Sequence, residues 1–378
     1  MSRPETHFAT SLFGAHPDQL WVITCYFNPC NYQSRWENYE TFARRLLAQG
    51  ARLLTVQLRR TAADTVLPAD LCTQLVDIVE PDVLWAKECL LNVALRHLPP
   101  ACTKVCWCDC DLIFANDNWL RDCADALDRH RVIQPFAYCR LMLRHEKWTD
   151  ATFALGQQES FGKMMQERLR TNDTKPIVES FKMFSAHPGF VWAARREVLH
   201  AAGGFCDLCI IGHGDLAMAL GFAHSPERDG PMRARLTGFW QPKWSHALGV
   251  AIRQWQRRAS DVVRGDVGFC DGTVYHLWHG AYHRRFYHER AVVLAELDPA
   301  RDMTRAASGI WQWTAAARAR DIPARLEAYF RDRAEDSSAK VSRTLPITFA
   351  SAKQRRLEWV KRESILKLRA EMEKRRAS

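Results

Sequence analysis

The first half of the chain alternates between short apolar runs and segments in which apolar residues recur every three or four positions. Residues 20–27 and 51–58 are apolar runs bounded by turn signals, a pattern typical of buried strands. Between them, Ser34 is a candidate N-cap for a helix that ends at Gly50. The pattern therefore predicts a strand, a helix and a second strand.

The alternation continues to about residue 280. It predicts helices over residues 85–98, 119–130, 196–202 and 216–220, and strands over residues 104–114, 131–138, 190–194 and 274–279. Strands that alternate with helices favour a largely parallel sheet with helices on both faces, and such sheets bind ligands beyond the carboxyl ends of their strands. Residues 144–182 are more polar and suggest an excursion or lid, and the chain from about residue 299 favours helices, the last one long.

The most informative motif is the run WCDCDLIF at residues 107–114. In a regular strand, side chains two apart share a face, so Asp109 and Asp111 would lie side by side. Adjacent carboxylates repel unless a cation or a proton lies between them. Mg²⁺ and Mn²⁺ prefer oxygen ligands and are often held by one or two carboxylates plus substrate phosphates. The motif indicates a metal–nucleotide site, and the alternative is a strand end with solvated acids.

Two further motifs carry candidate chemistry. His276 and His279 form a His-x-x-His pair, which suits a metal site, zinc included, or a strand with one packed histidine. Asp215 ends the glycine-rich segment GHGD and precedes a short helix, where it could act as an N-cap or as a general base. Cys206 and Cys209 form a lone CxxC pair, for which packing is favoured over a redox or zinc role.

Composition and charge narrow the class of protein. The chain has 378 residues, of which 47% are hydrophobic and 25% charged. This length is enough for one large α/β domain with a smaller piece, or for two domains. The net charge is +10, and residues 353–376 hold ten Lys or Arg against four Glu, a difference of 10 − 4 = +6. This basic tail suits either packing on the domain or binding of nucleic acid or another anionic surface.

The expected cellular location, and two enzyme classes that the sequence argues against, follow from motifs that the chain lacks. It has no run of about 18 apolar residues and no apolar signal segment at its N-terminus, so we expect a soluble, cytoplasmic protein with its 13 cysteines mostly reduced. It also lacks a phosphate-binding Walker loop and a dinucleotide-binding glycine fingerprint, which argues against NTPases and dehydrogenases.

Several segments together resemble GT-A-fold glycosyltransferases of the family-2-like superfamily, which are metal-dependent enzymes with nucleotide-sugar donors. The segments are residues 28–29 (NP) with 34–35 (SR), 85–88 (WAKE) with 91–92 (LN), 107–114, 188–196 (PGFVWAARR), 203–204 (GG), 212–215 (GHGD), 275–280 (YHLWHG) with Arg285 and Arg290, 298–299 (DP) and 333–336 (RAED). The resemblance implies a GT-A domain over residues 18–298, preceded by a flexible N-terminus (1–17) and followed by a helical region with a basic helix (299–378).

The resemblance also implies roles for individual residues. Asp111 would bind the Mn²⁺ or Mg²⁺ that bridges the donor diphosphate. Asp109 would contact the ribose or a metal-bound water. His276 or His279 would supply a further metal or diphosphate contact. Asp215 would be the general base if the enzyme inverts the anomeric configuration.

Two further residues, Asn28 and Lys87, would lie near the nucleotide. The expected reaction transfers a hexose or N-acetylhexosamine from a UDP- or GDP-sugar to a hydroxyl group. The hydroxyl would belong to a glycan, a lipid-linked sugar or a hydroxymethylpyrimidine in DNA, as in related phage enzymes. A non-catalytic nucleic-acid-binding protein and a metal-dependent nuclease or phosphatase are the alternatives, although neither explains all of these segments together.

Overall fold

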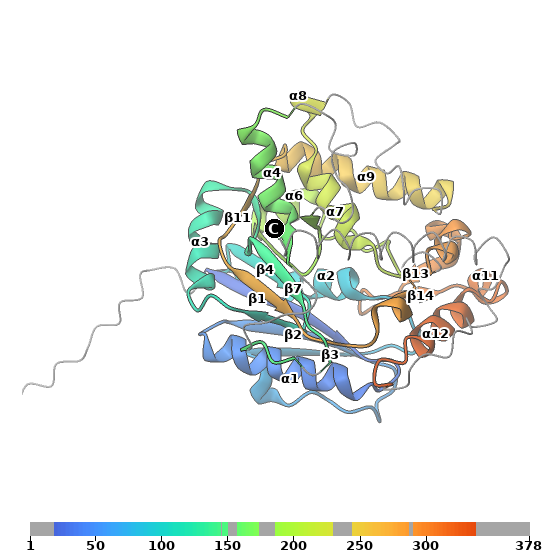
Figure 1. Ribbon diagram of the computed structural model, residues 1–378. Coiled ribbons are helices and arrows are strands. Elements are labelled where there is room, and N and C mark those ends of the chain that lie inside the picture. The colour runs from blue at the N-terminus through green and yellow to red at the C-terminus, as the bar shows by residue number, and fades with distance from the viewer. Residues whose placement is uncertain are drawn as a thin grey trace, which may run out of the picture.

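The computed structural model describes residues 19–144, 146–149, 157–173, 186–229, 244–286 and 290–337 (Figure 1). The predicted N-terminal segment, residues 1–17, and the basic tail lie outside the described residues. The domain boundary at residue 298 stays a prediction.

The larger of two main sheets has seven strands. They are β1 (Leu20–Phe27), β2 (Leu53–Arg59), β3 (Gln74–Val79), β4 (Lys104–Cys108), β6 (Val132–Gln134), β10 (Val191–Arg195) and β11 (Val267–Phe269). They lie in the order β11-β6-β10-β4-β1-β2-β3. β10 runs antiparallel to both of its neighbours, and the other pairings are parallel. The expected α/β class with a mixed, mostly parallel sheet is therefore confirmed.

The second sheet has five strands. Two of them come from segments that the sequence pattern predicted to be parts of strands in the first sheet. The strands of the second sheet are β5 (Leu112–Phe114), β12 (Thr273–His276), β7 (Tyr138–Leu141), β8 (Gln158–Ser160) and β9 (Ala186–His187), in that order. The predicted strand over residues 104–114 thus breaks at residues 109–111 and divides between the sheets as β4 and β5. The predicted strand over residues 131–138 divides in the same way at Pro135, which has no N–H to continue the ladder.

Helices cover both faces of the larger sheet. They are α1 (Gln33–Ala48), α2 (Lys87–His97), α3 (Trp119–Arg129), α4 (Phe161–Arg170), α6 (Arg196–Ala202), α7 (Gly214–Ala223), α8 (Pro226–Asp229) and α9 (His246–Val263). Side chains of β1 alternate between two cores: Val22 packs with α1 and α3, and Ile23 with α2, α6, α7 and α9. In Figure 1, α1 lies below the strands and α9 above them.

Some elements differ from the sequence pattern. β3 and α9 were not predicted, and the polar stretch 144–182 contains β8 and α4. α1 begins at Gln33, so Ser34 lies inside the helix and the predicted Ser34 N-cap is wrong. The N–H groups of Gln33 and Ser34 are instead capped by Asp336, at 2.7 and 2.9 Å, from the far end of the described chain. A cap that comes from so distant a residue leaves no local signal.

The C-terminal part consists of α10 (Pro299–Asp302), β13 (Met303–Arg305), β14 (Trp311–Trp313), α11 (Ala315–Arg318) and α12 (Ile322–Asp332). Three 3₁₀ turns complete the described elements: η1 (Ala69–Leu71), η3 (Tyr282–Arg285) and η4 (Arg290–Ala295). The β13–β14 hairpin interrupts what was predicted to be helical. Met303, Trp313 and Phe330 belong to the same core as the larger sheet, so this part packs on the sheet.

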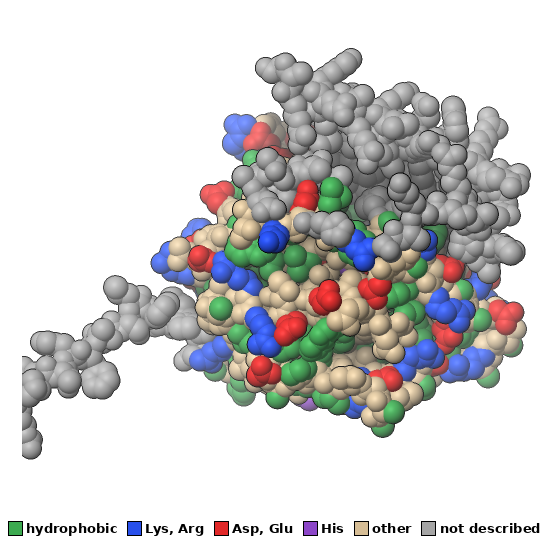
Figure 2. Space-filling view, turned by 60° about the horizontal axis from the view of Figure 1, so that its bottom comes forward, with side chains coloured by type: hydrophobic (Ala, Val, Ile, Leu, Met, Phe, Trp, Pro, Cys, Tyr) green, Lys and Arg blue, Asp and Glu red, His purple; other side chains and the backbone are tan. Residues whose placement is uncertain are grey.

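None of the described helices is both long enough and apolar enough to span a bilayer. On the face drawn in Figure 2, Lys and Arg side chains are interspersed with Asp and Glu.

Asp82 joins the C-terminal part to the sheet, and its loss should weaken the fold. Its Oδ2 accepts the buried N–H of Trp313 at 2.8 Å, and Nη2 of Arg318 lies 2.7 and 2.8 Å from its two carboxylate oxygens. We expect Asp82→Ala to lower the free energy of unfolding by about 1–3 kcal/mol, since a buried N–H loses its acceptor. Urea denaturation measures this change. Asp70→Ala, at a side chain 67% exposed, should change it by less than about 0.5 kcal/mol. Equal effects of the two substitutions on the free energy of unfolding would contradict the role of Asp82 in joining the C-terminal part to the sheet.

Candidate active site and metal centre

The site lies where the strand order of the larger sheet reverses. β1 and β4 are parallel neighbours, and the chain continues from β1 to β2 on the side away from β4. Ligands in α/β sheets bind beyond the carboxyl ends of strands at such a reversal. A cavity of about 280 Å³ lies there, and a second cavity of about 340 Å³ adjoins it. Tyr26 and Phe27, at the end of β1, line both cavities.

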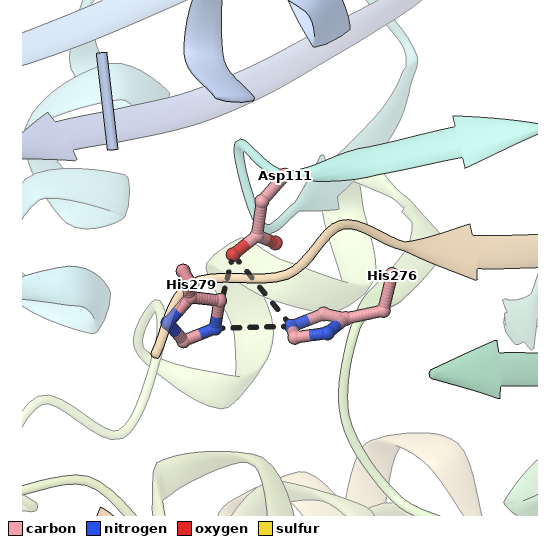
Figure 3. A group of neighbouring side chains, drawn as sticks. All are labelled: Asp111, His276 and His279. Carbon is pink, nitrogen blue, oxygen red and sulfur yellow. Dashed lines mark hydrogen bonds and ion pairs between the residues drawn. The ribbon is translucent and has the colours of Figure 1, made fainter. Parts of the chain in front are cut away.

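Asp111, His276 and His279 face one another at the edge of the first cavity (Figure 3). Oδ2 of Asp111 lies 3.6 Å from Nε2 of His276 and 3.3 Å from Nε2 of His279, and the two nitrogens are 3.3 Å apart. The backbone holds this arrangement, because the N–H of Leu277, next to His276, donates to the carbonyl of Asp111 at 2.9 Å. The structure thus brings together all three residues for which the resemblance implied a metal contact.

These three side chains fit a metal ion chemically. Oδ1 of Asp111 is buried and accepts no hydrogen bond within the described part of the chain. Burial and the charge of Asp109 raise the pKa of Asp111 to about 7, and burial with nearby Arg285 lowers the pKa of His279 to about 3. Burial also lowers the pKa of His276. Neutral imidazoles offer lone pairs, and three protein ligands leave positions free for water or phosphate, unlike a closed four-ligand structural zinc site.

Lys87 connects the two other predicted carboxylates. It is the first residue of α2 and is 5% exposed. Its Nζ lies 2.6 Å from Oδ1 of Asp109 and 2.8 Å from Oδ1 of Asp215. Burial by itself would lower the pKa of Lys87, but the two carboxylates hold it well above its usual range. The regular-strand picture, in which Asp109 and Asp111 share one face, is wrong: Asp109 pairs with Lys87, while Asp111 turns toward the histidines.

Asp215 lies in the first turn of α7, and one of its two carboxylate oxygens accepts a hydrogen bond from Lys87. The N-cap of α7 is His213, in a left-handed conformation with φ 75°, so the alternative that Asp215 acts as the N-cap is wrong. Oδ1 bonds to Lys87, and Oδ2 lies against Gly189, where a Cβ would come within 3.0 Å. The side chain is 30% exposed and lines the first cavity. Oδ2 therefore stays accessible to a ligand.

Several buried groups around the site have no simple signal in the sequence. Glu88 is 2% exposed, and a Cβ on Gly214 would collide with its carboxyl group. Burial, opposed by Lys87 and reinforced by Asp215, raises the pKa of Glu88 to about 8. Its place beside Lys87 in the family-like segment WAKE was the one available hint.

His187 and Phe190 form a second unpredicted pair. Their rings stack at 3.7 Å, and the ring of Phe190 also lies 4.8 Å from that of His276. The N–H of Gly189 donates to Nδ1 of His187 at 3.1 Å, and burial lowers the pKa of His187 to about 4. Phe190 has φ 77°, a left-handed conformation that is costly for an aromatic residue. This strained turn places an apolar ring against a metal-site histidine.

The other side of His279 contacts the C-terminal segment. Nη2 of Arg285 lies 3.1 Å from its Nε2, and Nη2 of Arg333 lies 3.3 Å from its Nδ1. Oε1 of Glu335 is 3.7 Å from the same Nδ1. Glu335 is also held by two hydrogen bonds from Arg35, at 2.7 and 2.8 Å. The segment 333–336, noted in the sequence only for its family-like letters, thus supports a metal-site residue.

Asn28 lies in the second cavity. Its side-chain amide donates to the carbonyl of Tyr32 at 2.8 Å, and its Oδ1 accepts the N–H of Tyr32 at 2.9 Å. It therefore closes the turn that follows β1, and it lines the cavity as part of that turn. Cys206 and Cys209, by contrast, are buried in the core away from both cavities, in agreement with a packing role.

Comparison with known proteins gives likenesses of structure only. No family model and no curated protein matches the chain. A mutant of Drosophila β1,4-galactosyltransferase 7, in complex with manganese, UDP-Gal and xylobiose, matches with a TM-score of 0.30 at 12% identity, over 53% of this chain and 60% of that one. Residues 1–349 of S. aureus TarS match with a TM-score of 0.33 at 12% identity, over 75% and 67%. Mouse xyloside xylosyltransferase 1 matches with a TM-score of 0.24 at 12% identity, over 68% and 96%.

The chain spans about 60% of the length of the galactosyltransferase. At this level of identity, the roles that we assign to individual residues rest on the geometry of this chain.

The raised pKa of Glu88 predicts a pH-dependent cost in stability. Folded, its carboxyl stays protonated to about pH 8; unfolded, it ionises near pH 4.5, so between these values folding takes up a proton and stability falls as pH rises. Glu88→Gln mimics the protonated form. We expect the variant to match wild type at pH 5 and to exceed its free energy of unfolding by about 1–3 kcal/mol at pH 9.

Urea denaturation in chelator-containing buffer at both pH values measures this difference. Glu37→Gln, on the exposed face of α1, controls for the loss of one negative charge. A Glu88→Gln variant whose advantage does not grow between pH 5 and pH 9 would contradict the prediction.

Proposed function

We propose that the protein is a metal-dependent glycosyltransferase that moves a hexose or N-acetylhexosamine from a UDP- or GDP-sugar to an acceptor hydroxyl. One observation carries the proposal: a three-ligand group at the strand-order reversal shares a cavity with a partly exposed carboxylate, Asp215. A sugar transferase needs both, one to stabilise a departing diphosphate and one to take the acceptor proton.

Asp111, His276 and His279 would hold the metal. When bound, Mn²⁺ or Mg²⁺ would neutralise the negative charge that develops on the leaving diphosphate. One carboxylate oxygen with two imidazole nitrogens suits Mn²⁺ better than Mg²⁺, because Mg²⁺ favours oxygen ligands. The stacked ring of Phe190 and the contacts to Arg333 and Glu335 would keep the imidazoles in place.

The nucleoside would occupy the second cavity, beyond β1, β2 and β3. Tyr26 and Trp36 line this cavity and offer aromatic surface to a base. Asn28 would act through the turn that it closes, rather than by direct contact. Asp109, which lines the first cavity, would face the ribose.

Asp215 would be the general base. Its Oδ1 accepts a hydrogen bond from Lys87, which orients the carboxylate, and its Oδ2 would receive the acceptor proton. Lys87 would therefore position both Asp109 and Asp215 and act on the donor indirectly. This role differs from the direct nucleotide contact that the resemblance implied.

The two alternative functions have no specific support. A non-catalytic nucleic-acid-binding protein gives no reason to bury Lys87 between two carboxylates beside a cavity. A nuclease or phosphatase would use the metal group but would leave the second, aromatic-lined cavity without a purpose.

Release of nucleotide from the donor tests the proposal. We expect turnover of UDP- or GDP-sugars with Mn²⁺, and a loss of about 100-fold or more in Asp111→Ala, because the charge on the departing diphosphate is no longer compensated. A screen of donors with detection of free UDP or GDP measures it. Asp117→Asn, at a side chain 73% exposed, is the matched control. Equal turnover by wild type and Asp111→Ala would refute the metal role.

For the acceptor, we take hydroxymethylated DNA as the first candidate to test, ahead of a glycan or lipid-linked sugar. Its support is the +6 charge of residues 353–376. We expect retention on duplex DNA near 50 mM salt and a loss of about 10³ in affinity near 200 mM, because cationic side chains release counterions from phosphates. A variant with Lys374, Arg375 and Arg376 changed to Gln should bind more weakly and with a smaller salt slope. Absence of retention at low salt, or retention that ignores salt, would favour the sugar acceptors.

A further inference from the structure

Two guanidinium groups contact opposite nitrogens of one histidine ring. Arg285 reaches Nε2 of His279 and Arg333 reaches Nδ1, at 3.1 and 3.3 Å. A guanidinium group can only donate hydrogen bonds, and a neutral imidazole has a single lone pair. Only one of the two contacts can therefore be a hydrogen bond.

The surroundings of Arg333 decide which one it is. Its Nε lies 2.5 Å from Oε1 of Glu335, and its Nη1 donates to the hydroxyl of Tyr329 at 2.9 Å, so it is well bonded without the histidine. The contact from Arg285 to Nε2 is also the shorter of the two, at 3.1 against 3.3 Å, and the negative charge of Glu335, 3.7 Å from Nδ1, favours a proton on that nitrogen. With the proton on Nδ1, the lone pair of His279 is on Nε2 and accepts from Arg285.

That same lone pair is the one a metal ion would need. Nε2 of His279 is the atom that faces Asp111 and His276, each at 3.3 Å. A lone pair cannot serve a guanidinium proton and a cation together, and a divalent ion would repel the guanidinium charge. Arg285 and a metal ion therefore exclude each other at His279.

We propose that Arg285 competes with the metal for His279 and, once displaced, binds the diphosphate of the donor. This step rests on the proposed function. Arg285 lines the same cavity as Asp111 and Asp215, so its long side chain needs only a local rotation to reach a ligand there. Guanidinium groups bind phosphate oxygens in a bidentate fork, and metal-bound diphosphate supplies such oxygens.

The consequence is coupled binding of metal and nucleotide. Metal alone must displace Arg285 without compensation, whereas metal with nucleoside diphosphate gives the guanidinium group a new anionic partner. By thermodynamic reciprocity, the nucleotide raises the affinity for the metal as much as the metal raises the affinity for the nucleotide. Arg285 is thus a positioning residue for the metal and a binding residue for the donor.

Binding of Mn²⁺ and of UDP or GDP to the full chain tests the proposal. Free Mn²⁺ is measured by electron paramagnetic resonance, and nucleotide binding by calorimetry at saturating Mn²⁺. We expect Arg285→Gln to bind Mn²⁺ alone about 3- to 30-fold more tightly than wild type, and nucleoside diphosphate about 10-fold more weakly. Arg285→Lys keeps the positive charge and should bind Mn²⁺ more weakly than Arg285→Gln does.

Arg284→Gln is the matched control, because Arg284 lies next in the chain and contacts the carbonyl of Asp332 instead of the site. It should change neither affinity. Equal or weaker Mn²⁺ binding by Arg285→Gln, with an unchanged melting temperature, overturns the competition. Unchanged nucleotide affinity overturns the diphosphate contact. If neither UDP nor GDP binds wild type, the proposed donor is wrong, while the titration with Mn²⁺ alone still decides the competition at His279.

Discussion

Repulsion among buried carboxylates is the constraint on which this site depends. Five carboxyl groups lie in or beside one cleft, those of Glu88, Asp109, Asp111, Asp215 and Glu335. Buried charges need partners, and most of these have one: Lys87 serves two of them, and Arg35 pairs with Glu335. Glu88 meets the constraint by staying protonated to about pH 8. Asp111 is left with a buried oxygen that accepts no hydrogen bond in the described chain, beside two neutral histidines. The charge that the protein leaves uncompensated is therefore concentrated where a divalent cation would compensate it.

The path of the chain explains why these groups meet. β4 leaves the larger sheet at Asp109, whose N–H bonds to the carbonyl of Phe190 at 2.8 Å, and three residues later β5 begins in the second sheet. Asp111 lies in that crossing, opposite the end of β12, which carries His276. The C-terminal segment then returns to the same place, where Asp336 caps α1 and Glu335 approaches His279. The site is thus built at the junction of two sheets and is fastened by residues more than 200 positions away from Asp111.

The fold class, the bounds of one helix and the residues of the candidate site could be predicted from local sequence patterns. The alternation of strands and helices predicted the mixed α/β class, and the boundaries of α6 were predicted without error because Gly203 ends it in a left-handed conformation. The three residues of the candidate metal group were all named in advance, from the Asp-x-Asp and His-x-x-His motifs and from the resemblance to a metal-dependent family. Their partners were not named: Ser34 was mistaken for an N-cap, and the N-cap alternative for Asp215 is also wrong, because an N-cap pattern does not reveal whether a distant group competes for the same position.

The sequence by itself determined which reactive side chains the protein has and which strands they follow. The continuous apolar runs of β1 and β4, buried at every position, require a sheet with a core on each face, and Asp109 and Asp111 must then follow the end of a buried strand. Only the tertiary structure decided what each carboxylate does. A regular strand would have made the two aspartates equivalent, but the crossing between sheets turns Asp109 toward Lys87 and Asp111 toward His276 and His279. The physical reason is that the groups within a few ångströms of a carboxylate determine its protonation and its binding partners. Here those groups come from distant parts of the chain.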